Sequence, residues 1–256
     1  MRAGQIFDKL CTLAPLESQM DFDNCGFAVG DALQEVDTVL VALDMSMPVA
    51  EEAARLGAQL IVTHHPLLFM PLKELRLGAG AAGDIAVRLI KENIGAIGLH
   101  TNFDIAPGGV NDQLAQALGL ENTTVLDETT GIGRIGELSA QQNIADFAHF
   151  VKKTLGAKFV RYAAGKGPVH RVAVAGGAGE DWFYMARQAG CDTFVTSEVS
   201  HHLFLEAAYF GLHLVDATHF ATEDAGCDAL CAFLVANCPG VRVVRSVVCR
   251  DITEVV

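Results

Sequence analysis

The chain has 256 residues, 51% of them hydrophobic, so it is long enough to bury a core as one large domain or two small ones. Its formal net charge is −13, from 18 basic and 31 acidic residues, and a surface this acidic argues against general nucleic-acid binding. The apolar runs are too short to span a membrane, and residues 1–15 lack the basic-then-apolar order of a signal peptide, so we expect a cytoplasmic protein without a membrane partner.

In chain order, the first clear pattern is a strand, a helix, a glycine and a second strand. Residues 39–43 and 60–63 are short apolar runs typical of buried parallel strands, and residues 48–56 between them have helical periodicity. Gly57 lies where the C-cap of that helix is expected. A further helix and a strand at residues 96–99 complete this part of the chain.

The same pattern returns later in the chain. Residues 169–196 align without gaps to residues 36–63, with eight identical positions. The elements predicted for this second copy are strands at 172–175, 193–196 and 212–215 and a helix at 181–189 followed by Gly190. The stretch 121–167 joins the copies and contains a predicted strand near 134–138 and an amphipathic helix near 144–155.

Strands that alternate with helices predict an α/β protein of two similar halves, with mainly parallel sheets covered by helices. We place the halves at residues 1–125 and 126–256, with the C-terminal segment also free to pack on the first half. In open α/β sheets, ligands bind beyond the carboxyl ends of the strands. We therefore expect the site in a cleft between the halves.

Side chains that ligate metals gather at the ends of these strands. His64 and His65, Asp104, and His219 each come shortly after a predicted strand. Glu223 lies four residues after His219, at the start of the last predicted helix, so the two can share one helical face. Imidazoles and carboxylates suit Zn²⁺, Mn²⁺, Fe²⁺ or Ni²⁺, and five such ligands fit two ions that also bind water. The pattern predicts a pair of divalent metal ions.

Each of these motifs also has an ordinary structural explanation. The two adjacent histidines could form a turn, and Asp104 could cap the helix that begins after Gly109. His219 and Glu223 could simply start a surface helix. The metal interpretation is favoured because all three motifs lie at strand ends in matching halves.

Other segments offer weaker candidates. The glycine-rich residues 176–179 could cradle a phosphate, but they lack the dinucleotide fingerprint and the P-loop lysine, so a tight turn is favoured. His201 is assigned to the surface. Cys227 and Cys231 lie four residues apart and could ligate zinc, but no second close pair completes such a site, and small buried hydrophobic residues are the favoured interpretation. Seven scattered cysteines argue against a disulfide framework.

At these motifs the sequence resembles the NIF-three-like dinuclear metal-centre family, also called GTP cyclohydrolase 1 type 2 homologues. The matching passages, in order, are DFDNCGFAVG at 21–30, IVTHHPLLF at 61–69, HTNFDIAPGGVND at 100–112, AGGAGED at 175–181 and DATHFATE at 216–223. The resemblance implies a two-metal site on the same five ligands. It also implies a homohexamer built as a trimer of dimers, and metal-dependent hydrolysis of GTP or a related purine nucleotide.

The sequence departs from the family pattern in two places. Phe22 replaces a usual tryptophan, and residues 196–198 are Thr-Ser-Glu where Thr-Gly-Asp is usual, with His202 in the place of the histidine that follows. No metal ligand is lost, but these positions could shape the substrate pocket. His100 and His202 are candidate catalytic residues for proton transfer or substrate contact, because imidazoles titrate near neutral pH.

Two classes of function remain open from the sequence. In a hydrolase, two ions would activate a water and stabilise developing charge, and for GTP cyclohydrolase chemistry the attack would open the imidazole ring of the purine. The alternative is a non-catalytic protein that binds or delivers metal or serves as a scaffold for partners. Turnover that depends on metal separates the two.

Overall fold

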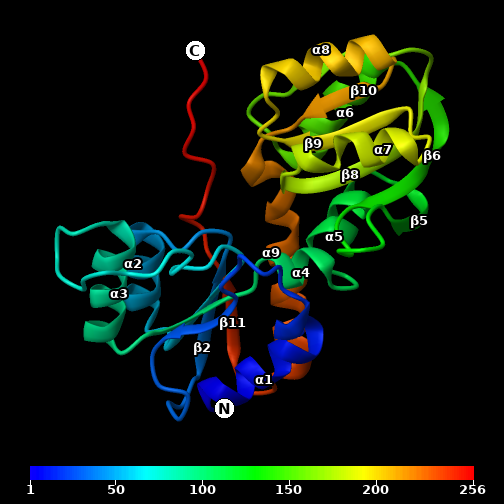
Figure 1. Ribbon diagram of the computed structural model, residues 1–256. Helices are drawn as coiled ribbons and strands as arrows, with labels where there is room; N and C mark the ends of the chain where they lie inside the picture. The colour runs from blue at the N-terminus through cyan, green and yellow to red at the C-terminus, as the bar shows by residue number, and fades with distance from the viewer. The chain divides into compact units, whose positions relative to one another are not determined.

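The computed structural model describes all 256 residues, and the chain divides into two compact units (Figure 1). The first unit comprises Met1–Ala106 and Cys227–Arg250, and the second comprises Pro107–Gly226 and Asp251–Val256. Both units are therefore discontinuous in sequence, whereas the predicted halves are continuous. No helix is long and apolar enough to cross a membrane.

The first unit is built on a 5-stranded sheet with the order β1-β4-β3-β2-β11. Its strands are β1 (Gly26–Val29), β2 (Thr38–Ala42), β3 (Leu60–Thr63), β4 (Gly95–Gly98) and β11 (Arg242–Arg245). The four strands from β4 to β11 run parallel, and only β1 at the edge is antiparallel to its neighbour. Every residue of β2, β3 and β4 is buried, as expected for parallel strands that are covered on both faces.

Helices cover this sheet on both sides. The helices in the N-terminal part of the first unit are α1 (Ala3–Leu13), η1 (Leu16–Ser18), α2 (Met47–Leu56), α3 (Ala81–Glu92) and α4 (Thr101–Ile105). Figure 1 shows α2 and α3 together on one side of the sheet and α1 on the other. Val49 of α2 and Leu89 of α3 pack in one core with Leu40 and Ile61 of the sheet. As predicted, Gly57 ends α2 in the left-handed conformation, with φ 64°.

The C-terminal part of the chain returns to the first unit. Strand β11 pairs in parallel with β2, and the boundary between the units falls within the long helix α9 (His219–Asn237). Glu52 of α2 is buried at 4% exposure and accepts hydrogen bonds from the Ser246 hydroxyl and the Val247 amide, the latter at 3.1 Å. A buried carboxylate needs such donors, so Glu52 fixes the segment that follows β11.

The second unit contains a 6-stranded sheet with the order β5-β6-β8-β9-β10-β7. Its strands are β5 (Glu121–Val125), β6 (Arg134–Gln142), β7 (Arg161–Ala163), β8 (Val169–Ala178), β9 (Thr193–Ser197) and β10 (His213–Asp216). Strands β8, β9 and β10 run parallel to one another. The other pairs are antiparallel: β5 with β6, β6 with β8, and β7 with β10. The predicted α/β class is confirmed, but this sheet is mixed rather than mainly parallel. The reason lies in the joining stretch, where β5 and β6 are separated by too few residues for a parallel crossover.

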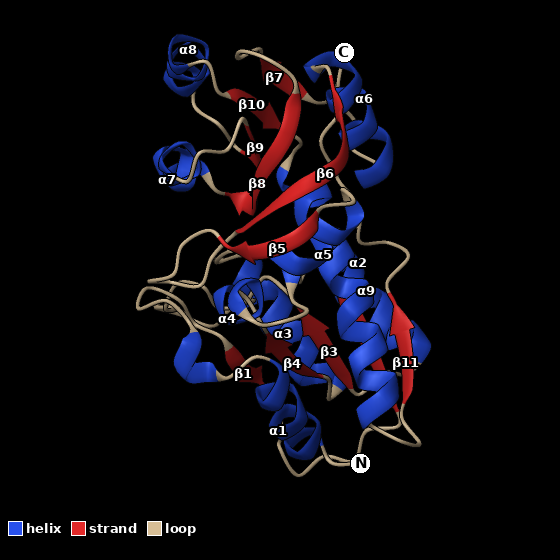
Figure 2. Cartoon of the chain, turned by 90° about the vertical axis from the view of Figure 1, so that its right-hand side faces the viewer, coloured by secondary structure: helices blue, strands red, loops and turns tan.

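Helices also cover both faces of the second sheet (Figure 2). They are α5 (Val110–Ala117), α6 (Ile144–Leu155), η2 (Glu180–Trp182), α7 (Phe183–Gln188) and α8 (His201–Phe210). Side chains alternate along β8, so Val172 and Val174 pack with α6, while Ala173 and Ala175 pack with α7 and α8. The helix predicted at 181–189 is present as η2 and α7 in succession.

Candidate metal centre

His64 and His65 directly follow β3, at the carboxyl end of a buried strand. The His64 ring is buried, and its Nδ1 lies 2.9 Å from the backbone oxygen of Leu99. The His65 Nδ1 lies 2.7 Å from Oδ1 of Asp44, which comes just after β2. Two neighbouring strand ends thus fix the orientation of both rings.

His100 and Asp104 come from the next strand end. His100 precedes α4 and Asp104 lies within it, one helical turn further on. The Asp104 Oδ1 is 3.6 Å from the His64 Nε2. The His100 ring lies 5.3 Å from His64 and 5.6 Å from His65, centroid to centroid, and the three histidines can each offer a nitrogen to one ion. The first unit therefore brings four candidate residues together.

Asp23 belongs to this cluster although ligand spacing did not identify it. Its Oδ1 is 2.9 Å from the His100 Nδ1, and its Oδ2 accepts a hydrogen bond from the Thr101 amide at 3.0 Å. Burial tends to raise the pKa of Asp23, but hydrogen bonds from His100 and Thr101, together with the imidazole charge, outweigh it and hold that pKa well below its ordinary value. The only signal in the sequence was its place in the passage at 21–30.

Phe22 packs against a second aromatic ring near this cluster. The Phe22 ring meets Phe69 edge to face at a centroid distance of 6.3 Å. The Phe69 ring in turn stands at 90° to His100, at 5.9 Å. Phe22 is thus linked to His100 through Phe69 by edge-to-face aromatic contacts.

His219 and Glu223 begin α9 in the second unit. They lie one helical turn apart, and the His219 Nε2 is 3.0 Å from the Glu223 Oε2. Glu223 is buried at 3% exposure. On its other side, the His219 Nδ1 lies 2.8 Å from Oε1 of Glu198, the residue that follows β9. Glu198 is the glutamate that stands where the resemblance described above has aspartate.

The glycine-rich residues 176–179 lie at the irregular end of β8, where the register with β9 shifts, and the three glycine amides already have partners. The amides of Gly176 and Gly177 donate to Asn111 and Thr222 at 2.9 and 3.0 Å, and the amide of Gly179 donates to Thr196 at 3.1 Å. These side chains occupy the donors that a phosphate would need. The phosphate cradle is therefore disfavoured, and the favoured tight turn is wrong for residues 176–178, which continue β8 as an irregular strand.

The histidines share one feature that suits a metal centre. In His64, His65, His100 and His219, Nδ1 lies within hydrogen-bond distance of a carbonyl or carboxylate oxygen. A neutral imidazole that donates from Nδ1 keeps its lone pair on Nε2. Ligating histidines in metalloproteins are commonly held by an oxygen partner in this way. The donor set therefore fits divalent transition metals.

The remaining candidates take no part in these Nδ1–oxygen contacts. His202 is exposed at the start of α8, where its Nδ1 lies 2.8 Å from the Ser200 hydroxyl, and His201 beside it is also exposed. Cys227 is buried, and burial raises the pKa of Cys231 to about 11, so this thiol is not poised to bind metal as a thiolate. All seven cysteines are free thiols.

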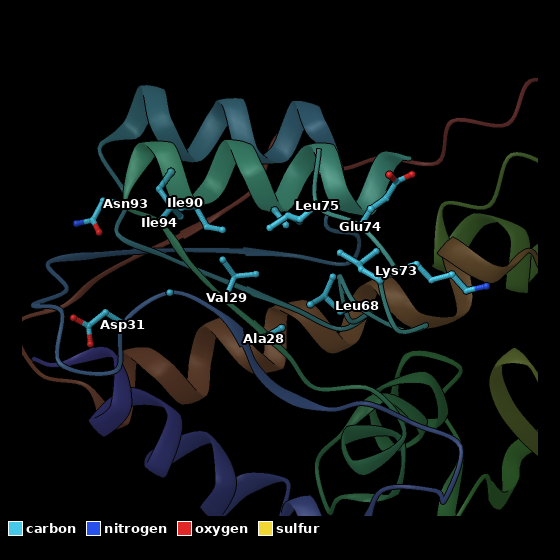
Figure 3. Close-up of a pocket in the computed structure, with 13 residues that line it drawn as sticks. Ala28, Val29, Asp31, Leu68, Lys73, Glu74, Leu75, Ile90, Asn93 and Ile94 are labelled. Carbon is cyan, nitrogen blue, oxygen red and sulfur yellow. The ribbon is translucent and has the colours of Figure 1, made fainter. Parts of the chain in front are cut away.

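A separate pocket of about 680 Å³ lies in the first unit (Figure 3). Its walls come from the end of β1, from α3 and from the loop between β3 and α3, and they are largely apolar, with Val29, Leu75 and Ile90 among the lining residues. Asp31 lies toward one end and Lys73 toward the other. None of the predicted metal ligands lines this pocket, so the metal chemistry and the pocket are distinct features.

A family model described as Duf34/NIF3 (NGG1p interacting factor 3) matches residues 1–252. The GTP cyclohydrolase 1 type 2 homolog of Clostridium perfringens is 33% identical over 229 residues, which cover 87% of each chain. The protein of the same name from a Nostoc species is 38% identical over 213 residues, covering 80% of this chain and 81% of the relative. A hypothetical protein of Staphylococcus aureus superposes with a TM-score of 0.92 at 28% identity, covering 100% of this chain and 99% of that one. Reduced HcgD from Methanocaldococcus jannaschii superposes with a TM-score of 0.83 at 29% identity, covering 96% and 97%.

Proposed function

Because the chain belongs to the Duf34/NIF3 family, we propose that it binds a pair of divalent metal ions and uses them to hydrolyse a purine nucleotide. The proposed metal ligands are His64, His65, Asp104, His219 and Glu223. The observation that carries the proposal is the set of Nδ1–oxygen contacts, which leave the Nε2 atoms to face a metal. Zinc, iron, manganese and nickel all suit imidazole and carboxylate ligands.

The ligands come from both units, three from the first and two from the second. We propose two ions rather than one, because five ligands exceed the need of a single tetrahedral ion. Two bound ions would supply a lowered water pKa and stabilisation of developing negative charge.

GTP is the first candidate substrate, since relatives of this chain carry the name GTP cyclohydrolase 1 type 2 homolog. His100 is the proposed proton-transfer residue. Asp23 holds its Nδ1, so its Nε2 can accept a proton from a water or give one to a leaving group. His202 is a second candidate, for substrate contact.

The test combines metal content with turnover. Purified protein loaded with Zn²⁺, Mn²⁺, Fe²⁺ or Ni²⁺ should hold about two ions per chain by elemental analysis, as the ligand count predicts. The loaded protein should convert GTP, or another member of a panel of nucleotides and phosphate esters. The His64→Ala/His65→Ala double variant is the control, and its activity should be lost.

Two outcomes would count against the proposal. A metal content near zero after reconstitution would exclude the dinuclear centre. Two bound ions without turnover, or equal product from wild type and control, would favour the alternative of a metal-binding, metal-delivery or scaffold protein.

We further propose that the chain assembles as a homohexamer, a trimer of dimers. Exposed apolar side chains such as Leu205 and Tyr209 on α8, at 62% and 81% exposure, are surface that an assembly can cover. Light scattering should then give about six times the chain mass of 27.2 kDa. A monomer at micromolar concentration would contradict this proposal.

A further inference from the structure

Glu198 has an unusual backbone conformation. Its φ is +56°, in the left-handed region that residues other than glycine and asparagine rarely adopt. Such outliers persist where the surrounding structure holds them, and they cluster at functional sites. Glycine would adopt this conformation without strain, so the glutamate side chain is expected to have a role at this position.

The neighbours of Glu198 are fixed by buried hydrogen bonds. The Ser197 hydroxyl donates to the Gly177 carbonyl at 2.5 Å, and the Val199 amide donates to the Asp216 carboxylate at 3.2 Å. The Glu198 side chain itself is 58% exposed, so burial does not hold it in place. Its recorded contact is to His219, with 2.8 Å between Oε1 and Nδ1. The strained turn between two anchored residues thus directs a carboxylate at that imidazole.

We propose that Glu198 is a positioning residue for His219. By accepting the Nδ1 proton, it fixes the tautomer and the ring orientation in which Nε2 faces Glu223, 3.0 Å away. This inference rests on the proposed function, in which His219 ligates a metal. The strained backbone of Glu198 costs folding free energy, and the gain in metal binding at His219 offsets that cost.

The decisive variant is Glu198→Gly, because glycine suits the left-handed conformation and has no carboxylate. Its melting temperature without metal should equal or exceed that of wild type. Its affinity for Zn²⁺, measured in competition with a chromophoric chelator, should fall by about tenfold, the lower end of the effect of losing an outer partner of a ligand. Glu198→Gln keeps an oxygen acceptor and should recover most of the affinity. Glu128→Ala removes an exposed carboxylate elsewhere in the same unit and should behave as wild type.

The outcomes separate this inference from the proposed function. Unchanged Zn²⁺ affinity in Glu198→Gly would overturn the positioning role while leaving the metal centre intact. A lowered melting temperature in both Glu198→Gly and Glu198→Gln would also overturn it, because Glu198 would then serve the fold. Failure of wild type itself to bind Zn²⁺ would overturn the proposed function, and this inference with it.

Discussion

Replacing Glu223 with glutamine should remove both metal ions, whereas His64→Ala or His65→Ala should mainly remove one. We expect Glu223 to bridge the ions, because a carboxylate can offer one oxygen to each and glutamine offers a single neutral oxygen. The position is buried at 3% exposure, so water cannot readily replace the lost ligand. The affinity for both ions should fall at least about 100-fold, the upper end of the effect of losing an outer partner. Elemental analysis and competition with a chelator measure this loss.

The fold should survive this substitution. Glutamine has nearly the same shape as glutamate, and it removes a buried negative charge when no metal is present. The melting temperature of the metal-free variant should therefore be equal to or above that of metal-free wild type. Full loading of Glu223→Gln with two ions would show that Glu223 is no bridge and would transfer that role to Asp104.

The repeated strand and helix pattern explains why much of the fold could be predicted. Strand β3 and helix α6 begin and end at the predicted residues, 60–63 and 144–155. Both have a strong local signal, a fully apolar strand in one case and amphipathic periodicity between Asn143 and Gly156 caps in the other. The predicted family resemblance is confirmed across the chain.

The parts that could not be predicted depend on pairing between distant segments. The antiparallel strands β5 and β6, at one edge of the second sheet, and β7, at the opposite edge, all lie in the joining stretch, outside the repeat. Strand direction there is set by tertiary contacts. The return of β11 to the first sheet involves residues about 200 positions from its partner β2, so local periodicity gives no sign of it.

The carboxylates behind the histidines were missed for the same reason. Asp23, Asp44 and Glu198 lie 77, 21 and 21 residues from the imidazoles that they hold. Motif spacing detects ligands that follow strands, because those positions share an edge by topology. Asp44 and Glu198 also follow strands, β2 and β9, but that position does not reveal which carboxylate contacts which imidazole. The pairing is set by the geometry of the folded chain.

Gly177→Ala should weaken metal binding at the proposed centre, because the new methyl group would displace a proposed ligand. Gly177 lies in β8 with φ +64°, and a Cβ at this position would lie 2.2 Å from Oε1 of Glu223 and 3.3 Å from Nε2 of His219. The carboxylate would have to move away from the place where it meets the imidazole. We therefore expect metal affinity to fall about 100-fold or more, exceeding the loss of an outer partner because a proposed ligand is displaced. The left-handed conformation should also lower the free energy of unfolding by about 1–2 kcal/mol.

Gly190→Ala separates these two effects. Gly190 lies in the same unit with φ +74°, but a Cβ there has nothing within 4 Å. Both variants should lose free energy of unfolding in urea, because both place alanine in the left-handed region, and Gly177→Ala should lose at least as much because Glu223 must also move. Only Gly177→Ala should lose metal, as judged by chelator competition on folded protein. Equal metal affinity in the two variants would mean that the Glu223 carboxylate can shift freely, which is incompatible with a bridge held rigidly beside His219.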